Sequence, residues 1–141
     1  MLKRKTLAEK GFKELVRKLD AVFSEFVRLN QVDDNGYVRC ITCGKLYNWK
    51  NIHNGHFISR SIFATRFNEI NCNPQCCHCN SFKQGEWLIY EQRLIEMYGE
   101  EKVNELKQIA RMGGRQDNNT LCEMIIEYRD KVKTLKREKG L

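Results

Sequence analysis

Two pairs of cysteines at the spacing of metal ligands are the feature of this sequence that most directly suggests chemistry. Cys40 and Cys43 form one CxxC pair, and Cys76 and Cys79 form a second pair. Each pair can supply two thiolates from one tight turn, and four thiolates complete the tetrahedral shell of a structural Zn²⁺ ion. Four buried thiols without a metal are the alternative, which this spacing disfavours. The sequence therefore predicts a closed structural zinc site.

The other three cysteines have no such pattern. Cys72 and Cys77 lie next to the second pair, so an exchange of ligands is conceivable, although the CxxC spacing favours Cys76 and Cys79. We expect Cys72, Cys77 and Cys122 to be small buried hydrophobic residues. The odd total of seven cysteines and the lack of an export signal argue against a disulfide framework.

Two histidines and two asparagines near the cysteine pairs could do further chemistry. His56 lies between the pairs, and an imidazole is suited to take a proton from water near neutral pH. His53 is a candidate ligand for a second metal ion, with a plain surface position as the equal alternative. Asn71 and Asn80 could orient the base or bind a divalent ion through an amide oxygen, although turn and helix-cap roles are as common.

Cations around these residues suggest a polyanionic partner. Arg60, Arg66 and Lys83 could bind phosphate groups, with ordinary surface charge as the alternative. The net charge is +7, with basic residues gathered at both ends and an acidic stretch at residues 86–110. Such a balance favours nucleic acid, because bound phosphates release their counterions, but basic charge alone is a weak signal.

The elements that must position these residues form one α+β domain of 141 residues. Residues 1–35 hold a basic arm and an amphipathic helix that should end near Asn30, preceded by a capping-box sequence that starts at Thr6. Residues 36–85 hold the metal-binding core, with short strands near residues 37–41 and 56–58.

Residues 86–141 form a helical tail. A helix with Trp87 and Leu88 on its apolar stripe should close at Gly99, a second should span residues 100–110 with Val103, Leu106 and Ile109 inward, and a last helix should open at a capping box beginning with Thr120. The apolar face of the last helix could pack on the first helix or pair with a second subunit. No run of 18 apolar residues and no signal peptide is present, so we expect a soluble chain that is not secreted and has no membrane partner.

Taken together, these residues resemble the HNH, or ββα-metal, endonuclease superfamily, in which a cysteine pair, a histidine, an asparagine, a second cysteine pair and a final His or Asn follow one another. Within that superfamily the chain is similar to the phage lambda NinG family, also called Rap. The similarity spans nearly the whole chain and is most specific in five stretches: GYVRCITCG at 36–44, GHF at 55–57, RFNEIN at 66–71, QCCHCN at 75–80 and YG at 98–99.

The resemblance implies a zinc-stabilised HNH core and a structure-specific DNA endonuclease that acts on branched recombination intermediates such as Holliday junctions. By position, His56 would be the general base, Asn71 the structural asparagine, and Asn80 a ligand of a catalytic Mg²⁺ or Mn²⁺ ion. Many HNH enzymes carry an acidic or histidine ligand directly before the base, whereas this chain has Gly55. The NinG pattern places an aspartate three residues before the base, where His53 stands, so His53 is the expected replacement ligand.

The same resemblance implies a phage- or prophage-encoded protein in the cytoplasm of a bacterial host. Symmetric cutting of a four-way junction requires two active sites, so we expect a homodimer, with the long terminal helices as one route to it. Three alternatives stay open: an HNH nicking or double-strand nuclease without junction preference, a zinc-knuckle DNA-binding module without catalysis, and a purely structural zinc protein.

Overall fold

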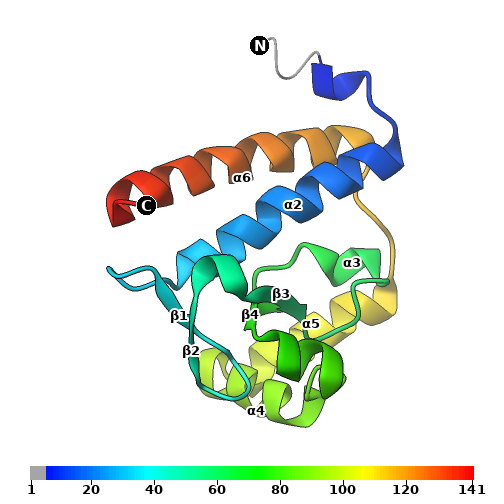
Figure 1. The fold of residues 1–141 in the computed structure, drawn as a ribbon. Helices are drawn as coiled ribbons and strands as arrows, with labels where there is room; N and C mark the ends of the chain where they lie inside the picture. Colours follow the sequence, from blue (N-terminus) through cyan, green and yellow to red (C-terminus); the bar gives the residue numbers. More distant parts are fainter. Residues whose placement is uncertain (1–5) are drawn as a thin grey trace.

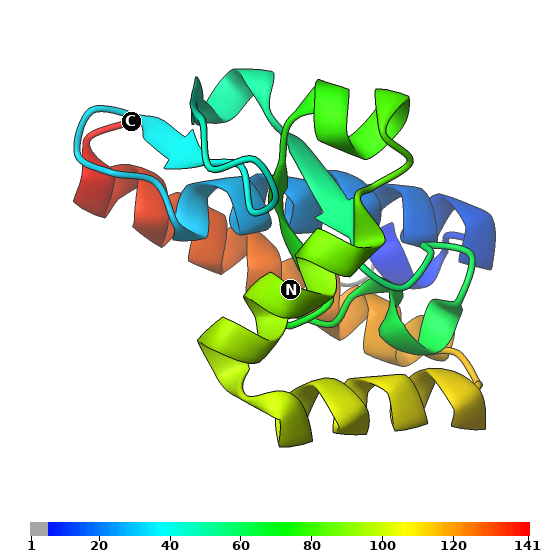
Figure 2. The same cartoon turned by 90° about the horizontal axis from the view of Figure 1, so that it is seen from below.

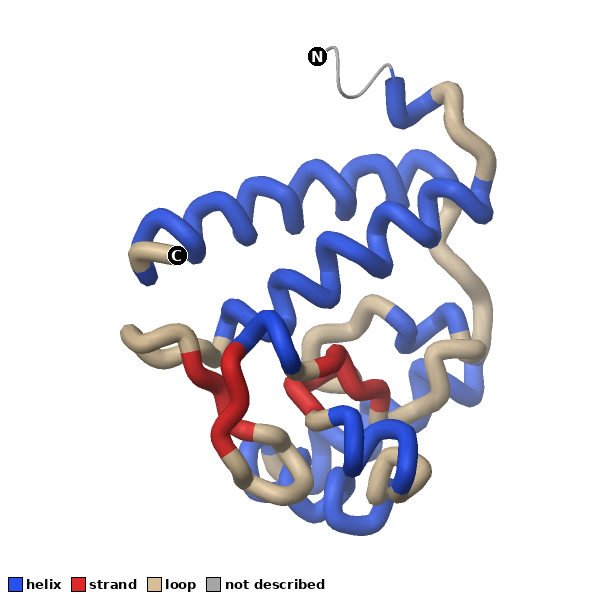
Figure 3. Tube along the Cα trace, in the orientation of Figure 1, coloured by secondary structure: helices blue, strands red, loops and turns tan. Residues whose placement is uncertain are grey.

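Two long helices and a small core of short strands and helices make up the chain in the computed structural model, which describes residues 6–141 (Figures 1 and 3). This arrangement confirms the predicted mixture of helices and small antiparallel sheets. In chain order the elements are α2 (Phe12–Asn30), β1 (Tyr37–Arg39), β2 (Leu46–Asn48), the 3₁₀-helix η1 (Trp49–Asn51), β3 (His53–His56), α3 (Phe63–Arg66), β4 (Cys72–Gln75), the π-helix η2 (His78–Phe82), α4 (Trp87–Tyr98), α5 (Glu100–Met112) and α6 (Asn118–Lys139).

Helix α2 forms because its apolar residues recur at steps of three and four, which places them on one face. Its last residue is Asn30, as predicted. Its start differs from the prediction, because residues 6–8 form a separate helical turn and α2 begins only after Gly11. The capping-box sequence that starts at Thr6 therefore lies within that turn and does not cap α2. The residues buried along α2 are Leu15, Val16, Leu19, Phe23, Phe26, Val27 and Leu29.

Helix α6 packs along α2, and α2 lies between α6 and the β3–β4 sheet (Figure 1). At the centre of this contact, the ring of Tyr128 meets those of Phe23 and Phe26 with centroids 4.8 and 4.9 Å apart, both in edge-to-face geometry. The apolar face of α6 is therefore buried within the same chain, which decides between the two packings that the sequence left open.

The start of α6 corrects a second capping prediction. Asp117 is the N-cap, and its side chain accepts a hydrogen bond of 2.7 Å from the Thr120 amide. Thr120 therefore lies inside the helix as a main-chain donor and not at its boundary. Aspartate and threonine side chains both suit an N-cap, so the local sequence does not decide which of the two residues caps the helix.

Both sheets are two-stranded and antiparallel. Strand β1 pairs with β2, and β3 pairs with β4 in a register that places His53 opposite Gln75 and His56 opposite Cys72. The first predicted strand is confirmed as Tyr37–Arg39. The second begins and ends earlier than predicted, because the main chain of Ile58 hydrogen-bonds to a side chain and leaves the ladder after His56.

Helices α4 and α5 lie on the side of the strands away from α6, and Figure 2 shows the molecule from that side. Tyr90 and Leu94 carry the packing of α4, whereas Trp87 and Leu88, predicted to face inward, are 59% and 65% exposed. Glu86, with a φ of 49°, turns the chain just before α4, so this turn and not the apolar pattern sets which face of the helix is buried.

Helix α5 follows its prediction more closely. Val103 and Leu106 are buried as expected, and Ile109 is 42% exposed, contrary to the prediction. The helix runs to Met112, two residues beyond the predicted end. Within residues 6–141, no helix is both long enough and apolar enough to cross a membrane.

Candidate functional site

The four cysteines of the two CxxC pairs meet in one cluster, as predicted. The sulfur atoms of Cys40, Cys43, Cys76 and Cys79 all lie within 4.8 Å of one another, and those of Cys43 and Cys76 are 3.9 Å apart. Four sulfurs bound to one Zn²⁺ at about 2.3 Å are separated by about 3.8 Å. The cluster is therefore a possible metal site whose size is consistent with structural zinc.

Hydrogen-bond donors around the sulfurs support this assignment. The Cys76 amide donates to the Cys40 sulfur over 3.3 Å, and the Cys79 amide donates to the Cys76 sulfur over 3.4 Å. Burial raises the pKa of the Cys40 thiol, but hydrogen bonds from surrounding amides and from Thr42 more than offset burial and lower this pKa to about 6. Burial raises the pKa of Cys79 to about 12. A bound cation is what would let all four thiols ionise together.

The remaining cysteines lie outside this cluster. Cys72 and Cys122 are buried, as predicted for small hydrophobic residues. Cys77 is exposed, contrary to the prediction. Cys77 lies between the two cysteines of the second pair in a tight turn. Because the sulfurs of that pair point into the cluster, the side chain of Cys77 points away from it.

Gln75 braces the cluster against the strands. Its fully buried side chain donates to the Thr42 hydroxyl over 3.2 Å and to the Gly85 carbonyl over 2.8 Å, which joins the first knuckle to the loop after η2. This side chain crosses directly over Gly55, where an added Cβ would approach the Gln75 Cβ to 2.6 Å. No side chain fits at position 55, which explains why glycine stands there and not an acidic ligand.

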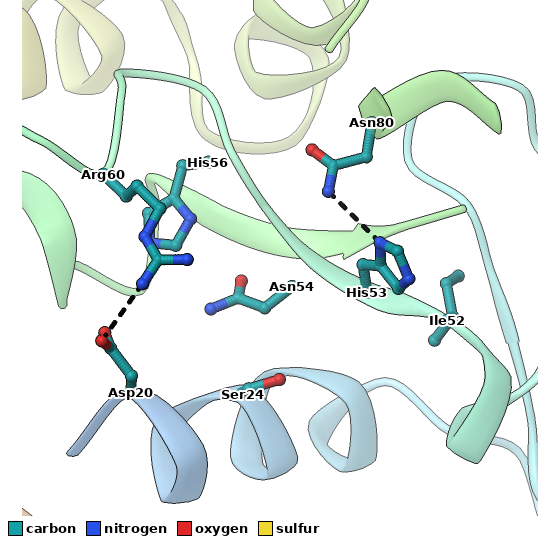
Figure 4. Close-up of a pocket in the computed structure, with 8 residues that line it drawn as sticks. All are labelled: Asp20, Ser24, Ile52, His53, Asn54, His56, Arg60 and Asn80. Atoms are coloured by element: carbon teal, nitrogen blue, oxygen red, sulfur yellow. Dashed lines mark hydrogen bonds and ion pairs between the residues drawn. The ribbon is translucent and has the colours of Figure 1, made fainter. Parts of the chain in front are cut away.

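Four of the predicted site residues line one pocket of about 280 Å³ beside the cluster (Figure 4), whereas Asn71 does not. His53, His56, Arg60 and Asn80 line it, and α2 forms the opposite wall. Lys83 does not line this pocket and forms an ion pair with Glu86 instead. The other lining residues, which sequence reasoning did not select, are Asp20, Ser24, Ile52 and Asn54.

His56 is held in one orientation by a main-chain acceptor. Its Nε2 lies 3.0 Å from the Arg66 carbonyl oxygen. A carbonyl only accepts, so Nε2 carries the hydrogen and Nδ1 keeps its lone pair. Burial lowers the pKa of His56, and the positive charges of Arg60 and Arg66 lower it further. The ring is therefore a neutral proton acceptor at neutral pH.

Asn71 fixes the loop that follows His56. Its fully buried side chain accepts from the Ile58 amide over 2.7 Å and donates to the Ile58 and Thr65 carbonyls, each over 3.0 Å. These three bonds hold the start and end of residues 58–65 together. Asn71 thus fixes this loop through its side chain and does not line the pocket.

His53 and Asn80 face each other across the far end of the pocket (Figure 4). The side-chain amide nitrogen of Asn80 lies 3.4 Å from Nδ1 of His53. His53 comes from β3 and Asn80 from η2, directly after a cysteine of the cluster. An imidazole nitrogen and an amide oxygen are both acceptable ligands for a divalent ion, so the pair could hold one.

Asp20, on α2, binds the guanidinium groups of two arginines. The Arg66 guanidinium binds both of its carboxylate oxygens, at 2.9 and 2.5 Å, and Arg60 approaches one of them at 3.3 Å. Arg66 is only 11% exposed, so its charge is committed to Asp20, whereas Arg60 is 64% exposed and open to a ligand. A lone carboxylate on a helix carries no sequence signal of this contact, because the partners are 46 residues apart.

The fold and the site together define a small α+β protein with a four-cysteine cluster beside a pocket lined by histidine and asparagine. The family model described as "Bacteriophage Lambda NinG protein" matches residues 1–138. The chain belongs to the NinG family of lambdoid phage proteins, as its sequence motifs suggested.

Individual relatives agree with this assignment. The chain is 29% identical to protein ninG of Escherichia phage lambda over 99% of its own length and 66% of that protein. It is likewise 29% identical to protein ninG of Salmonella phage P22, over 96% of its own length and 64% of that protein. The chain thus spans about two thirds of the length of these relatives. No solved structure matches it.

Proposed function

We propose that this chain is a metal-dependent DNA endonuclease that acts on branched recombination intermediates such as Holliday junctions. The observation that supports catalysis most directly is the orientation of His56, whose Nε2 is engaged by the Arg66 carbonyl while its Nδ1 is free to accept a proton. His56 lines the same pocket as the His53–Asn80 pair and the exposed Arg60. A base, a pair of candidate metal ligands and a cation in one pocket are what phosphodiester hydrolysis requires.

In the proposed mechanism, Nδ1 of His56 takes a proton from a water molecule that attacks phosphorus in line with the leaving 3′ oxygen. Arg60 binds a non-bridging phosphate oxygen and orients the scissile group. Asn80 and His53 would hold a Mg²⁺ or Mn²⁺ ion, which supplies Lewis-acid stabilisation of the leaving oxygen. Asn71 keeps the loop after His56 in place, so that base and phosphate stay aligned.

Zinc in the four-cysteine cluster has a structural role in this proposal. It joins the knuckle between β1 and β2 to the start of η2, and Asn80 follows Cys79 directly. The metal thereby fixes the position of a catalytic ligand without taking part in the reaction.

The preference for branched DNA and the homodimer belong to the same proposal and are supported by membership of the NinG family. Two active sites are needed to cut a four-way junction symmetrically. Since the apolar face of α6 packs on α2, a dimer would use other surfaces than that face. The proposed site of action is the cytoplasm of the bacterial host.

Cleavage of a labelled four-way junction beside a matched linear duplex, with Mg²⁺ or Mn²⁺ present or omitted, tests the proposal. We expect metal-dependent cutting of the junction that falls about 10²–10⁴-fold in His56→Ala. His78→Ala is the matched control, because His78 does not line the pocket. Equal cutting of both substrates would indicate an HNH nuclease without junction preference, and tight binding without cutting would indicate a DNA-binding module.

A further inference from the structure

Two exposed cations of α2 lie on the same face of the helix as the residues that line the pocket. Lys13, Arg17, Asp20 and Ser24 follow one another at steps of four, three and four residues, so they share one face of the helix. Asp20 and Ser24 line the pocket, and Lys13 and Arg17 extend the same strip toward the start of α2. Lys13 is exposed and Arg17 is 77% exposed. Positive charge therefore leads out of the candidate active site along α2.

A second strip of cations lies on the neighbouring flank of α2. A groove of about 420 Å³ between α2 and α6 is lined by three cations, Lys18 from α2 and Arg129 and Lys136 from α6, together with Glu25 and apolar residues of both helices. On α6, Arg129, Lys133, Lys136 and Arg137 recur at steps of four, three and one, which places them along one side of the helix. Lys18 follows Arg17 directly in the sequence, so the two strips lie next to each other on the exposed side of α2.

Most of the positive charge on this surface is not neutralised internally, although Arg17 pairs with Glu14. Two carboxylates beside the strips are already paired, Glu14 with Lys10 and Arg17, and Glu25 with Lys136. Lys13, Lys18, Arg129, Lys133 and Arg137 form no ion pair with any other residue in the described part of the chain, 6–141. The acidic stretch of the chain lies instead on α4 and α5, on the opposite side of the strands (Figure 1).

We propose that Lys13, Arg17, Lys18, Arg129, Lys133 and Arg137, here called the α2–α6 basic surface, bind the backbone of a DNA duplex arm that enters the pocket. The inference rests on the proposed function and names the surface that holds the substrate. An α-helix with its side chains is about 10–12 Å wide, and duplex DNA carries one charge per about 1.7 Å of its axis. One arm laid across α2 would thus offer several phosphates to these cations while a strand reached the pocket.

The test measures binding without cleavage, in a His56→Ala background. Fluorescence anisotropy with a labelled four-way junction gives the affinity over a series of salt concentrations. The variant Lys18→Ala with Arg129→Ala is compared with Arg93→Ala with Lys102→Ala, which also removes one arginine and one lysine but from α4 and α5. Circular dichroism melts of both variants check that the fold is intact.

We expect the Lys18/Arg129 variant to bind more weakly and its slope of log affinity against log salt to fall by about 1.8, or about 0.9 for each phosphate that is no longer neutralised. The Arg93/Lys102 variant should keep the slope of the background. Equal slopes in both variants, or no binding of DNA at all, would overturn the proposal. A reduced slope in this background, together with a protein carrying His56 that never cuts the junction, would uphold this surface and refute the proposed catalysis, so the two failures are distinguishable.

Discussion

His56 depends for its proposed role on staying neutral, and its surroundings favour that state. Burial and two nearby guanidinium groups lower the pKa of His56 below the ordinary value of 6.5. We therefore expect the single-turnover cleavage rate to hold its plateau as pH falls through 6.5 and to decline only at lower pH. A rate that declines already above pH 6.5 would contradict this assignment.

The same shift affects stability. Below pH 6.5 the unfolded chain binds a proton at this histidine before the folded chain does, so the free energy of unfolding falls as pH falls toward the lower folded pKa. Above pH 6.5 the histidine is neutral in both states and contributes no pH dependence. Comparing the pH dependence of denaturant unfolding in the wild type and in His56→Ala isolates this contribution.

The close approach of the Gln75 side chain to Gly55 leads to a prediction about stability. An added methyl group would collide with the Gln75 side chain, which is fully buried and hydrogen-bonded on two sides and cannot move away. We expect Gly55→Ala to lower the free energy of unfolding by about 1–3 kcal/mol, as overpacking does. Urea denaturation measures this, with Gly11→Ala as the control, because nothing lies within 4 Å of a methyl group there.

That control should cost at most about 1 kcal/mol, which is the range of an N-cap effect at the start of α2. If both variants unfolded at the same urea concentration, the close approach of Gln75 to β3 would not be the reason for glycine at position 55.

At the scale of residues, the sequence was sufficient to select candidate site residues that lie at fixed spacings within short motifs. The four cysteine ligands, His56 and Asn80 could be selected because each lies at a fixed offset within a short motif. Asp20 could not be selected, since its importance comes from Arg66, 46 residues away, and a carboxylate on an exposed helix face has no distinctive neighbours. Arg66 was predicted to bind phosphate because the sequence does not show that its guanidinium group is paired with Asp20.

Among the elements, η2 depends most on the cysteine cluster. It begins inside the second CxxC pair and carries Asn80, so the loss of one metal ligand should release it. We expect Cys43→Ser to abolish stoichiometric zinc binding and to lower the free energy of unfolding by about 2 kcal/mol or more. Elemental analysis and denaturant unfolding measure the two effects.

Cys77→Ser is the matched control, because Cys77 is exposed like Cys43 but is not part of the cluster. This variant should keep its zinc and its stability. Loss of zinc from Cys77→Ser but not from Cys43→Ser would show that the ligands are exchanged.

Element boundaries were predictable where a single residue type decides them. Gly99, with a φ of 91°, ends α4 as expected, since glycine adopts this conformation without strain. The end of β3 was not predictable, because it is set by the Asn71 side chain reaching Ile58. The buried face of α4 was predicted only in part: Leu94, which belongs to the expected apolar stripe, is fully buried, but Trp87 and Leu88 are exposed because α4 carries apolar residues on more than one face.

The whole molecule is tied together by the contact between α2 and α6. Ile125 of α6 is fully buried in the main core, so Ile125→Ala should lower the free energy of unfolding by about 2–5 kcal/mol. Ile109→Ala on α5 is the control, since this side chain is 42% exposed and its loss should cost little. Guanidinium denaturation followed by tryptophan fluorescence and by circular dichroism measures both.

We expect the two probes to report one coincident transition in each variant, because the same core joins α2, α6 and the strands. Separate transitions would mean that the helix pair unfolds independently of the metal-binding centre.

The pairing of α2 with α6 also imposes an order on how the protein is made. Helix α2 leaves the ribosome before α6, and the part of its apolar face that packs on α6 has no partner until α6 follows, after residues 31–117 have been synthesised. At bacterial rates of translation that interval is roughly 5–20 s, during which the face is open to chaperones or to neighbouring nascent chains. Both cysteine pairs emerge well before α6. Metal captured at that stage would organise the centre early and hold α2 close to where its partner arrives, so zinc supply during translation should govern the yield of folded protein.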